Sequence, residues 1–280
     1  MPRQSRSWKS TSEHPFFDRS AAGLRLNAAG KSLLPYAETI AANADSAAAA
    51  VAAVTTGRLK ELRVSVTPTL QPDVLAAAVR SFRIRYPEVK LIFTSGFLAD
   101  CRSKILTDKI DLALAMTARY QTEELANLTA EPLFEVDQGV VAAVGHRIFA
   151  PGADIRAVFE ESEWLTTVQD EKFLISHLAE LGLAPPKSLT LCDLFAIDAL
   201  KGRSEALSFS PLSVAEDIRY TGRVAALDPV HFPLPPPTVS FFHRKGVELS
   251  PPADYMRLAV TQAFDSWFRA SPHWWVRLPA

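Results

Sequence analysis

The feature that most restricts the fold is an alternation of strand-like and helix-like segments from about residue 58 onward. Residues 62–66 alternate apolar and polar side chains and are rich in valine, which predicts a β-strand. Pro68 ends this strand, and residues 72–86 then carry apolar side chains three or four positions apart, as an amphipathic helix does. Two more strands with a helix between them follow, at 89–94, 99–107 and 110–115. This βαβαβ order predicts a parallel sheet with right-handed crossovers and an α/β fold.

The alternation continues along the rest of the chain and predicts a second α/β unit. Strands are expected at 139–144, 163–168, 188–192, 206–209 and 238–243, and helices at 153–161, 171–181, 193–201, 211–219 and 252–266. A proline-rich segment at 232–237 is predicted to be a stiff linker, because it leads directly into a strand. The order indicates two lobes. Residues 58–136 together with 238–280 form lobe 1, and residues 137–237 form lobe 2.

The first part of the chain has a different character. Residues 1–13 are polar and serine-rich, and we expect them to be a disordered lead-in. Residues 14–27 contain two short extended pieces around a small-residue turn, which predicts a β-hairpin with Arg19 on one arm and Arg25 on the other. Asn27 is a suitable N-cap for the helix that follows.

A long helix is predicted at residues 28–57, and its apolar residues form a narrow seam. They recur at alternating spacings of four and three, with the large ones at Leu33, Ile40, Val51 and Val54. Such a seam suits a partner helix better than a broad core face, so we predict a homo-oligomer formed through this helix. The alternative is that a chance seam arises because alanine occupies so many of these positions.

Composition and charge exclude several classes of protein. The chain has 280 residues, of which 48% are hydrophobic and 22% are charged, so it can bury a core. Its net charge of −1 excludes a chain that is strongly basic overall, as many nucleic-acid-binding proteins are. The two cysteines, Cys101 and Cys192, lack metal or redox spacing and are expected to be free buried thiols, with a disulfide as the alternative. No apolar run is long enough to span a membrane, so a soluble cytoplasmic protein is expected.

The usual signatures of an enzyme are missing. The six histidines have no metal-ligand spacing, and the sequence contains no nucleophile elbow, no P-loop and no dinucleotide-binding glycine motif. We therefore expect no catalytic residue, no metal and no cofactor.

Ligand-binding residues are expected in the turns that follow strands, because open α/β sheets bind ligands at the carboxyl ends of their strands. The candidates are Thr67, Thr69, Ser95, Gly96 and Thr117 in lobe 1, and Gln169, Phe195, Ser210 and Pro211 in lobe 2. Hydroxyls, amides and helix N-termini suit an organic acid. No arginine or lysine occupies these turns, which favours a singly charged or aromatic acid over a phosphate. For each residue, helix capping or packing is the alternative role.

Several segments together resemble LysR-type transcriptional regulators. Residues 16–30 resemble the wing of that family's winged helix-turn-helix, and residues 33–37 resemble the start of its dimerising linker helix. Residues 62–70, 110–115, 131–134 and 192–195 resemble short segments of its effector-binding domain. The whole resemblance runs from His14 to about Phe268. It implies a two-lobe fold like that of periplasmic binding proteins, with a small-molecule effector in the cleft.

The resemblance also implies a contact with operator DNA, but the chain departs from the family pattern at its start. Such regulators normally place roughly fifty further residues, including the recognition helix, before the wing. Here 13 residues precede it, so specific operator binding by the chain as written is doubtful. Arg19 and Arg25 of the wing offer phosphate contacts and little base readout. The alternative function is a cytosolic ligand-binding or dominant-negative partner protein that dimerises without binding DNA.

Overall fold

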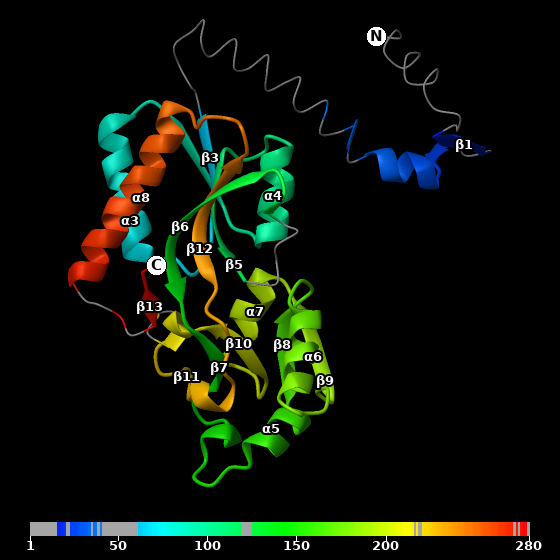
Figure 1. Ribbon diagram of the computed structural model, residues 1–280, viewed down its shortest axis with the longest axis vertical. Helices are drawn as coiled ribbons and strands as arrows, with labels where there is room; N and C mark the ends of the chain where they lie inside the picture. The colour runs from blue at the N-terminus through cyan, green and yellow to red at the C-terminus, as the bar shows by residue number, and fades with distance from the viewer. Residues whose placement is uncertain are drawn as a thin grey trace, which may run out of the picture.

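A computed structural model describes residues 16–20, 23–34, 36, 37, 40, 61–118, 125–215, 217, 220–270, 273 and 275–278. From residue 61 onward the described residues form two lobes, each built on one β-sheet (Figure 1). The predicted two-lobe α/β fold is therefore confirmed.

The sheet of lobe 1 has six strands in the order β13-β6-β12-β5-β3-β4. They are β3 (Glu61–Val66), β4 (Lys90–Thr94), β5 (Leu112–Thr117), β6 (Leu128–Val136), β12 (Thr238–Arg244) and β13 (Val276–Arg277). Strand β3 pairs in parallel with both β4 and β5, which confirms the predicted βαβαβ unit. Strand β12 returns from lobe 2 and inserts antiparallel between β5 and β6.

Helices cover both faces of this sheet. Helices α3 (Pro72–Arg85) and α8 (Pro251–Ala270) lie side by side on one face, and α4 (Leu98–Leu106) lies on the other (Figure 1). Strand β5 is buried on both faces: Leu112 and Leu114 join the cluster under α3 and α8, while Ala113 and Ala115 pack against α4. The absence of alternation in this strand is what a central strand of a covered sheet requires.

The sheet of lobe 2 has five strands in the order β11-β7-β10-β8-β9. Its strands are β7 (Gln138–Ala143), β8 (Glu163–Thr167), β9 (Ser188–Cys192), β10 (Leu207–Pro211) and β11 (Val224–Ala226), and its helices are α5 (Ile155–Glu161), α6 (Glu171–Glu180) and α7 (Leu194–Leu200). The core centres on Trp164, whose ring contacts Phe159 and Phe232. The Trp164 indole Nε1–H donates to the Phe159 carbonyl at 2.9 Å, so this buried polar group is satisfied.

Three sequence predictions need correction. The helix expected at 211–219 is described only as the 3-10 turn η3 (Leu212–Ala215). Strands β6 and β13 were not predicted, and β13, with two residues, is too short to show periodicity. The face of the 72–86 helix was expected at Leu75, Val79, Phe82 and Tyr86. Phe82 is buried as expected, and Leu75 and Tyr86 pack against the core, but the other fully buried positions of α3 are Val74 and Ala78.

The hairpin predicted near the start of the chain is confirmed. Strand β1 (Phe17–Ser20) pairs antiparallel with β2 (Gly23–Leu26), and Asn27 Oδ1 accepts a hydrogen bond of 2.9 Å from the Gly30 N–H, as an N-cap does. A Cβ at Gly30 would lie 2.2 Å from the Phe16 carbonyl oxygen, so only glycine fits there.

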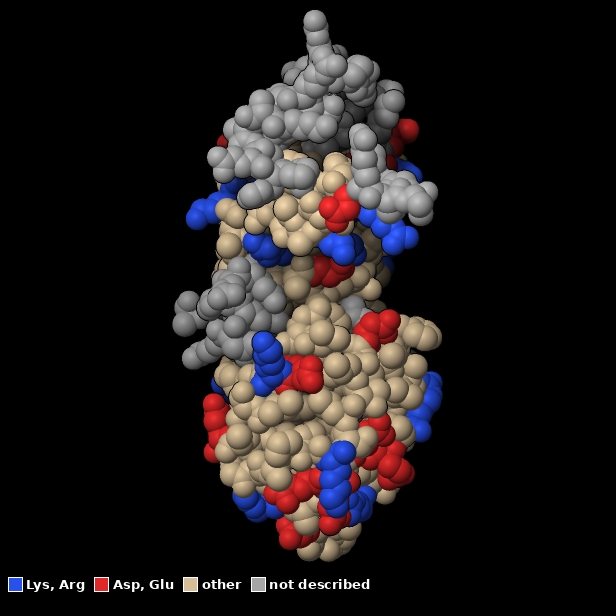
Figure 2. All heavy atoms as spheres, turned by 90° about the vertical axis from the view of Figure 1, so that its right-hand side faces the viewer, with Lys and Arg blue, Asp and Glu red and all other residues tan. Residues whose placement is uncertain are grey.

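The proposed helix seam is only partly within the described residues. Residues 28–34 are helical, with Leu33 half-buried and Ile40 exposed. Val51 and Val54, like residues 1–13, lie outside the described residues, and pairing through this helix stays a prediction. The surface of the two lobes carries both signs of charge: on the face in Figure 2, Lys and Arg side chains stand among Asp and Glu side chains.

Candidate functional site

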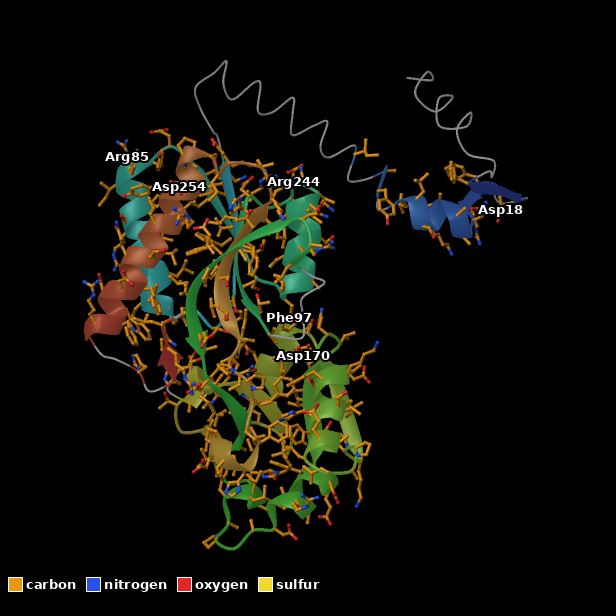
Figure 3. All side chains as sticks on the ribbon, viewed as in Figure 1. Asp18, Arg85, Phe97, Asp170, Arg244 and Asp254 are labelled. Carbon is orange, nitrogen blue, oxygen red and sulfur yellow. The ribbon has the colours of Figure 1, made fainter. Side chains whose placement is uncertain are left out.

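A pocket of about 120 Å³ lies between the two lobes. Lobe 1 lines it with the turn after β3, the start of α4 and the end of β5; lobe 2 lines it with the turn after β8, the end of α7, and β10 with η3. Phe97 of lobe 1 and Asp170 of lobe 2 lie near each other at the boundary (Figure 3). The pocket is thus built from the strand ends where an open α/β sheet is expected to bind a ligand.

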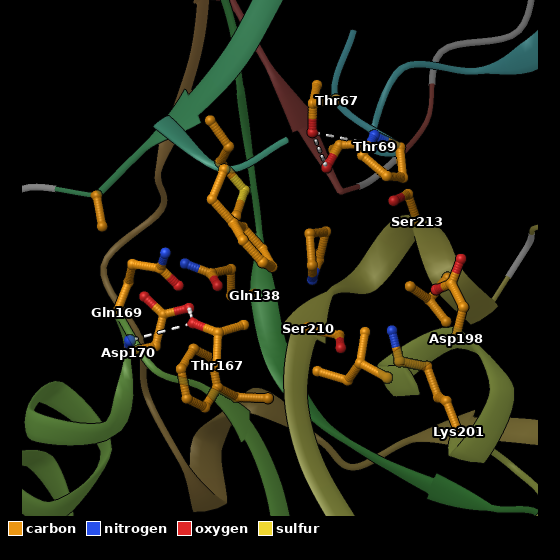
Figure 4. Close-up of a pocket in the computed structure, with 18 of the residues that line it drawn as sticks. Thr67, Thr69, Gln138, Thr167, Gln169, Asp170, Asp198, Lys201, Ser210 and Ser213 are labelled. Carbon is orange, nitrogen blue, oxygen red and sulfur yellow. Dashed lines mark hydrogen bonds between the residues drawn. The ribbon is translucent and has the colours of Figure 1, made fainter. Parts of the chain in front are cut away.

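The turn after β3 brings two hydroxyls to the pocket. The Thr67 N–H donates to the Leu114 carbonyl at 2.8 Å, which fixes the turn to β5. The Thr67 hydroxyl donates to the Thr69 hydroxyl at 3.2 Å (Figure 4). Helix α3 begins later, at Pro72, with Gln71 as its N-cap. The alternative in which these threonines cap the helix is therefore wrong, and contact with an effector stays a prediction.

The start of α4 forms a second part of the lobe 1 wall. Gly96, Phe97 and Leu98 line the pocket there. Phe97 is the N-cap of α4, and its apolar side chain cannot accept a hydrogen bond from the N–H groups of the first turn. A Cβ at Gly96 would lie 2.5 Å from Asp100 Oδ2. Glycine therefore allows the Asp100 carboxylate to fold back over the helix start.

On lobe 2, the turn between β8 and α6 is held by a reciprocal pair of hydrogen bonds. The Thr167 hydroxyl donates to Asp170 Oδ2 at 2.7 Å, and the Asp170 N–H donates to the Thr167 hydroxyl oxygen at 3.1 Å (Figure 4). This pair orients Gln169, which lies between them and lines the pocket. The result is a rigid polar rim with one carboxylate.

The deeper part of the lobe 2 wall is charged. Lys201 is 7% exposed, and its Nζ lies 5.5 Å from the centroid of the Tyr220 ring, a cation–π geometry. The Tyr220 hydroxyl donates to Asp198, and Asp217 also lines this side. The strand-end turns contain no lysine or arginine, as the sequence indicated, but Lys201 reaches the pocket from the end of α7. Lys201 was not among the predicted residues, because it follows the end of helix α7 and not the end of a strand.

The structure brings six of the nine predicted ligand-binding residues to this pocket: Thr67, Thr69, Gly96, Gln169, Ser210 and Pro211. The other three, Ser95, Thr117 and Phe195, are not among the lining residues. Ser95 is exposed, and Phe195 points to solvent with 82% of its surface exposed. Thr117 turns its hydroxyl inward, where it has no hydrogen-bond partner within the described residues.

Several polar lining residues were not predicted, namely Gln138, Thr167, Asp170, Asp198, Lys201, Ser213, Asp217 and Tyr220. Two of them had a usable signal. Asp170 follows the predicted strand at 163–168, and Gln138 lies at the predicted boundary between the lobes. Ser213 comes from η3, which the sequence did not predict, whereas Asp198 and Lys201 come from helix α7 and its C-cap, where the strand-end rule does not apply.

The described residues give no indication of a metal or redox site. Among them, no group of three or more His, Cys, Asp or Glu side chains could hold a metal ion. Cys101 and Cys192 are free and buried, and burial raises the pKa of both thiols, which keeps them protonated and unreactive. Among the described helices, none is both long enough and apolar enough to cross a membrane.

Comparison with known proteins identifies the family. Residues 55–265 match the LysR substrate binding domain. The chain is 26% identical over 220 residues to a probable nitrogen assimilation transcriptional activator of Synechococcus elongatus, covering 74% of this chain and 67% of that protein.

Solved structures share the fold at lower identity. A full-length OxyR variant from Pseudomonas aeruginosa is 18% identical with a TM-score of 0.54, covering 92% of this chain and 82% of that one. The effector binding domain of QuiR in complex with shikimate is 14% identical with a TM-score of 0.56, covering 74% of this chain and 97% of that one. The predicted resemblance is confirmed. This chain belongs to the LysR family of transcriptional regulators, and the two-lobe unit is its effector-binding domain.

Proposed function

We propose that the pocket between the lobes binds a small organic acid, whose carboxylate is held by Lys201. Lys201 carries this proposal, because it is the one cationic side chain among the described lining residues and is almost fully buried. A buried ammonium group at a ligand pocket favours an anionic partner, since charge-assisted hydrogen bonds gain strength when water is excluded.

The carboxylates around Lys201 narrow the class of acid. Asp170, Asp198 and Asp217 line the same wall and would repel a ligand that presents only negative groups to them. Hydroxyl or amino groups on the ligand would instead donate to these carboxylates. Within the predicted class of organic acids, a hydroxy acid or an amino acid therefore fits better than an acid without such donor groups. QuiR, whose effector domain shares this fold, was solved with shikimate, which is a hydroxylated carboxylic acid.

The test is a binding screen. The chain would be titrated with a panel of hydroxy acids, amino acids, plain aromatic acids and sugar phosphates, with binding followed by thermal shift and then by calorimetry. A ligand raises the melting temperature according to its concentration relative to its dissociation constant. We expect hydroxy or amino acids to bind best. Binding only by neutral sugars or amines would contradict the proposal.

We further propose that the chain forms a homo-oligomer through the helix at residues 28–57. The described part of this segment is helical and has an N-cap at Asn27. Sedimentation of Ile40→Asp together with Val51→Asp is the test, with Glu38→Asp together with Ser46→Asp as control changes off the seam. We expect the double seam variant to lose the oligomer. An unchanged sedimentation coefficient would contradict the role of the seam.

Operator binding is tested separately, because ligand sensing does not require it. The hairpin β1–β2 carries Arg25 as an exposed cation, which suits a phosphate contact without sequence readout. A gel-shift titration with the upstream DNA of the gene and with random duplex separates the two roles. Preference for the upstream DNA supports an operator-binding regulator. Equal binding to both duplexes supports the partner protein that dimerises without operator recognition.

A further inference from the structure

We infer that the segment 273–278 is a clasp on the hinge between the lobes, and that it holds them at their present angle. The chain passes between the lobes twice, once at residues 136–138, where β6 leads into β7, and once at 232–238, where it returns into β12. The two passages are joined by a hydrogen bond of 3.1 Å from the Val136 N–H to the Pro237 carbonyl. Any rotation of the lobes must change backbone angles in these passages.

Asp137 stands at the centre of the first passage, and the segment binds it twice. The Asp137 N–H donates to the Trp275 carbonyl at 2.8 Å. The Arg277 guanidinium lies 2.8 Å from Asp137 Oδ1. Strand β13 continues this contact by pairing Val276 with Val136, and it lies beside the passage in Figure 1. The backbone and the side chain of the hinge residue are thus both held by the same short segment.

The segment itself is anchored in lobe 1. Trp275 is 1% exposed and belongs to the core cluster under α3 and α8. Its ring lies 5.9 Å from the Trp267 ring of α8, and His273 stacks on Trp267 at 4.4 Å. The clasp therefore has a fixed end, so its bonds to Asp137 resist movement of the hinge relative to lobe 1.

From the other side, Asp137 is held by lobe 2. Its carbonyl accepts a hydrogen bond of 2.8 Å from the Leu212 N–H, at the start of η3. Leu212 is fully buried and packs closely over Gly139, where a Cβ would lie 2.8 Å from Leu212 Cδ2. The next residues of η3, Ser213 and Val214, line the pocket. A short route of direct contacts thus runs from the pocket through η3 and Asp137 to the clasp.

The clasp therefore helps to determine the angle between the two lobes. Rotation at Asp137 has to loosen the bonds to Trp275 and Arg277 or the bond to Leu212. Weakening the clasp therefore raises the population of other lobe angles before any ligand is present. The inference does not depend on which molecule the pocket binds.

Arg277→Ala is the variant of choice, because Arg277 is 59% exposed at its side chain and its removal should leave the core intact. Hydrogen exchange would be followed at the peptide that contains Asp137. We expect protection of the Asp137 amide to fall by about two- to fivefold, the factor that corresponds to losing a partly exposed ion pair. Asp137→Asn, which removes the charge but keeps the size of the side chain, should produce the same change. The two changes combined should add little further.

Distances between the lobes give the second readout. Spin labels would be attached to Ile84→Cys in lobe 1 and Val230→Cys in lobe 2, because both positions are exposed. Dilution with unlabelled chain ensures that the measured distances join two labels of the same molecule. We expect Arg277→Ala to broaden the distance distribution.

Arg147→Ala is the matched control, since Arg147 forms an ion pair of the same length, 2.8 Å, with Glu161 at the surface of lobe 2. Unchanged protection and distances in Arg277→Ala would overturn the inference, and so would an equal effect of Arg147→Ala. Either result would leave ligand binding in the pocket untouched.

Discussion

The two walls of the pocket differ in charge, although each comes from an α/β lobe with the same type of strand-end turns. All the described lining residues of lobe 1 are uncharged, and its polar groups there are the threonine hydroxyls and the free N–H groups at the start of α4. Lobe 2 supplies every ionisable side chain of the described lining, namely Asp170, Asp198, Lys201, Asp217 and Tyr220.

This difference separates two tasks. Neutral donors accept many ligands, because each hydrogen bond exchanges for one with water at a small net gain. A charged wall discriminates more strongly, because a ligand must present groups of complementary charge to it or meet electrostatic repulsion. We therefore expect lobe 2 to decide which molecule binds and lobe 1 to contribute affinity with little discrimination.

The largest effect should come from Lys201→Met, which keeps the length of the side chain and removes its charge. A hydrogen bond to a charged group contributes about 1.5–3 kcal/mol, so affinity for the best acid of the panel should fall roughly tenfold to hundredfold. Calorimetry measures this loss, and urea unfolding checks that the fold is retained. Lys187→Met, at an exposed lysine of the same lobe, is the control. A smaller loss than that caused by the lobe 1 variants would reverse the proposed division between the walls.

The lobe 1 wall is tested by Thr67→Val together with Thr69→Val. Each substitution keeps the shape of the side chain and removes the hydroxyl, and a neutral hydrogen bond contributes about 0.5–1.5 kcal/mol. Affinity should fall roughly two- to tenfold for each hydrogen bond to the ligand that is removed, and by a similar factor for every acid that binds. Full affinity in a folded double variant would show that the two hydroxyls bond only each other. A change in the ranking of ligands would contradict the view that this wall discriminates little.

Lowering the pH should destabilise lobe 2 slightly more than lobe 1. His146 in lobe 2 is buried, with Nδ1 accepting from the Ile148 N–H at 3.0 Å, and burial lowers the pKa of this histidine. Because the unfolded chain takes up the proton first, stability falls as the pH drops below about 6.5. The loss is less than about 1.4 kcal/mol per pH unit, the limit for one group. Hydrogen exchange at pH 7.5 and 5.5 should show greater loss in lobe 2 than in lobe 1.

His146→Asn serves as the control for this effect, because asparagine can still accept from the Ile148 N–H but does not titrate. The variant should flatten the pH dependence of lobe 2. An unchanged pH dependence would assign the acid sensitivity to other groups.

The same contrast explains what the sequence could and could not predict. Periodicity placed most of the strands and helices to within a few residues, because segments such as β3 alternate apolar and polar side chains. In lobe 1 the strand-end rule found Thr67, Thr69 and Gly96, which follow closely after strands, but it also selected Ser95 and Thr117, which do not line the pocket. The charged wall was largely missed, because Lys201 and Asp217 reach the pocket from the end of a helix and from a loop. Their position depends on how α7 and η3 pack, which no local pattern encodes.

The smallest effect is expected from Phe195→Ala. The strand-end rule places Phe195 at the ligand, but its side chain is 82% exposed and does not line the pocket. Affinity should change by less than about twofold, because an exposed side chain that does not touch the ligand contributes little to binding. A decrease above roughly tenfold would mean that the lobes close further around the ligand and bring Phe195 against it. The wall of lobe 2 would then be apolar at its rim as well as charged in its depth, and the contrast between the lobes would hold only for the open pocket.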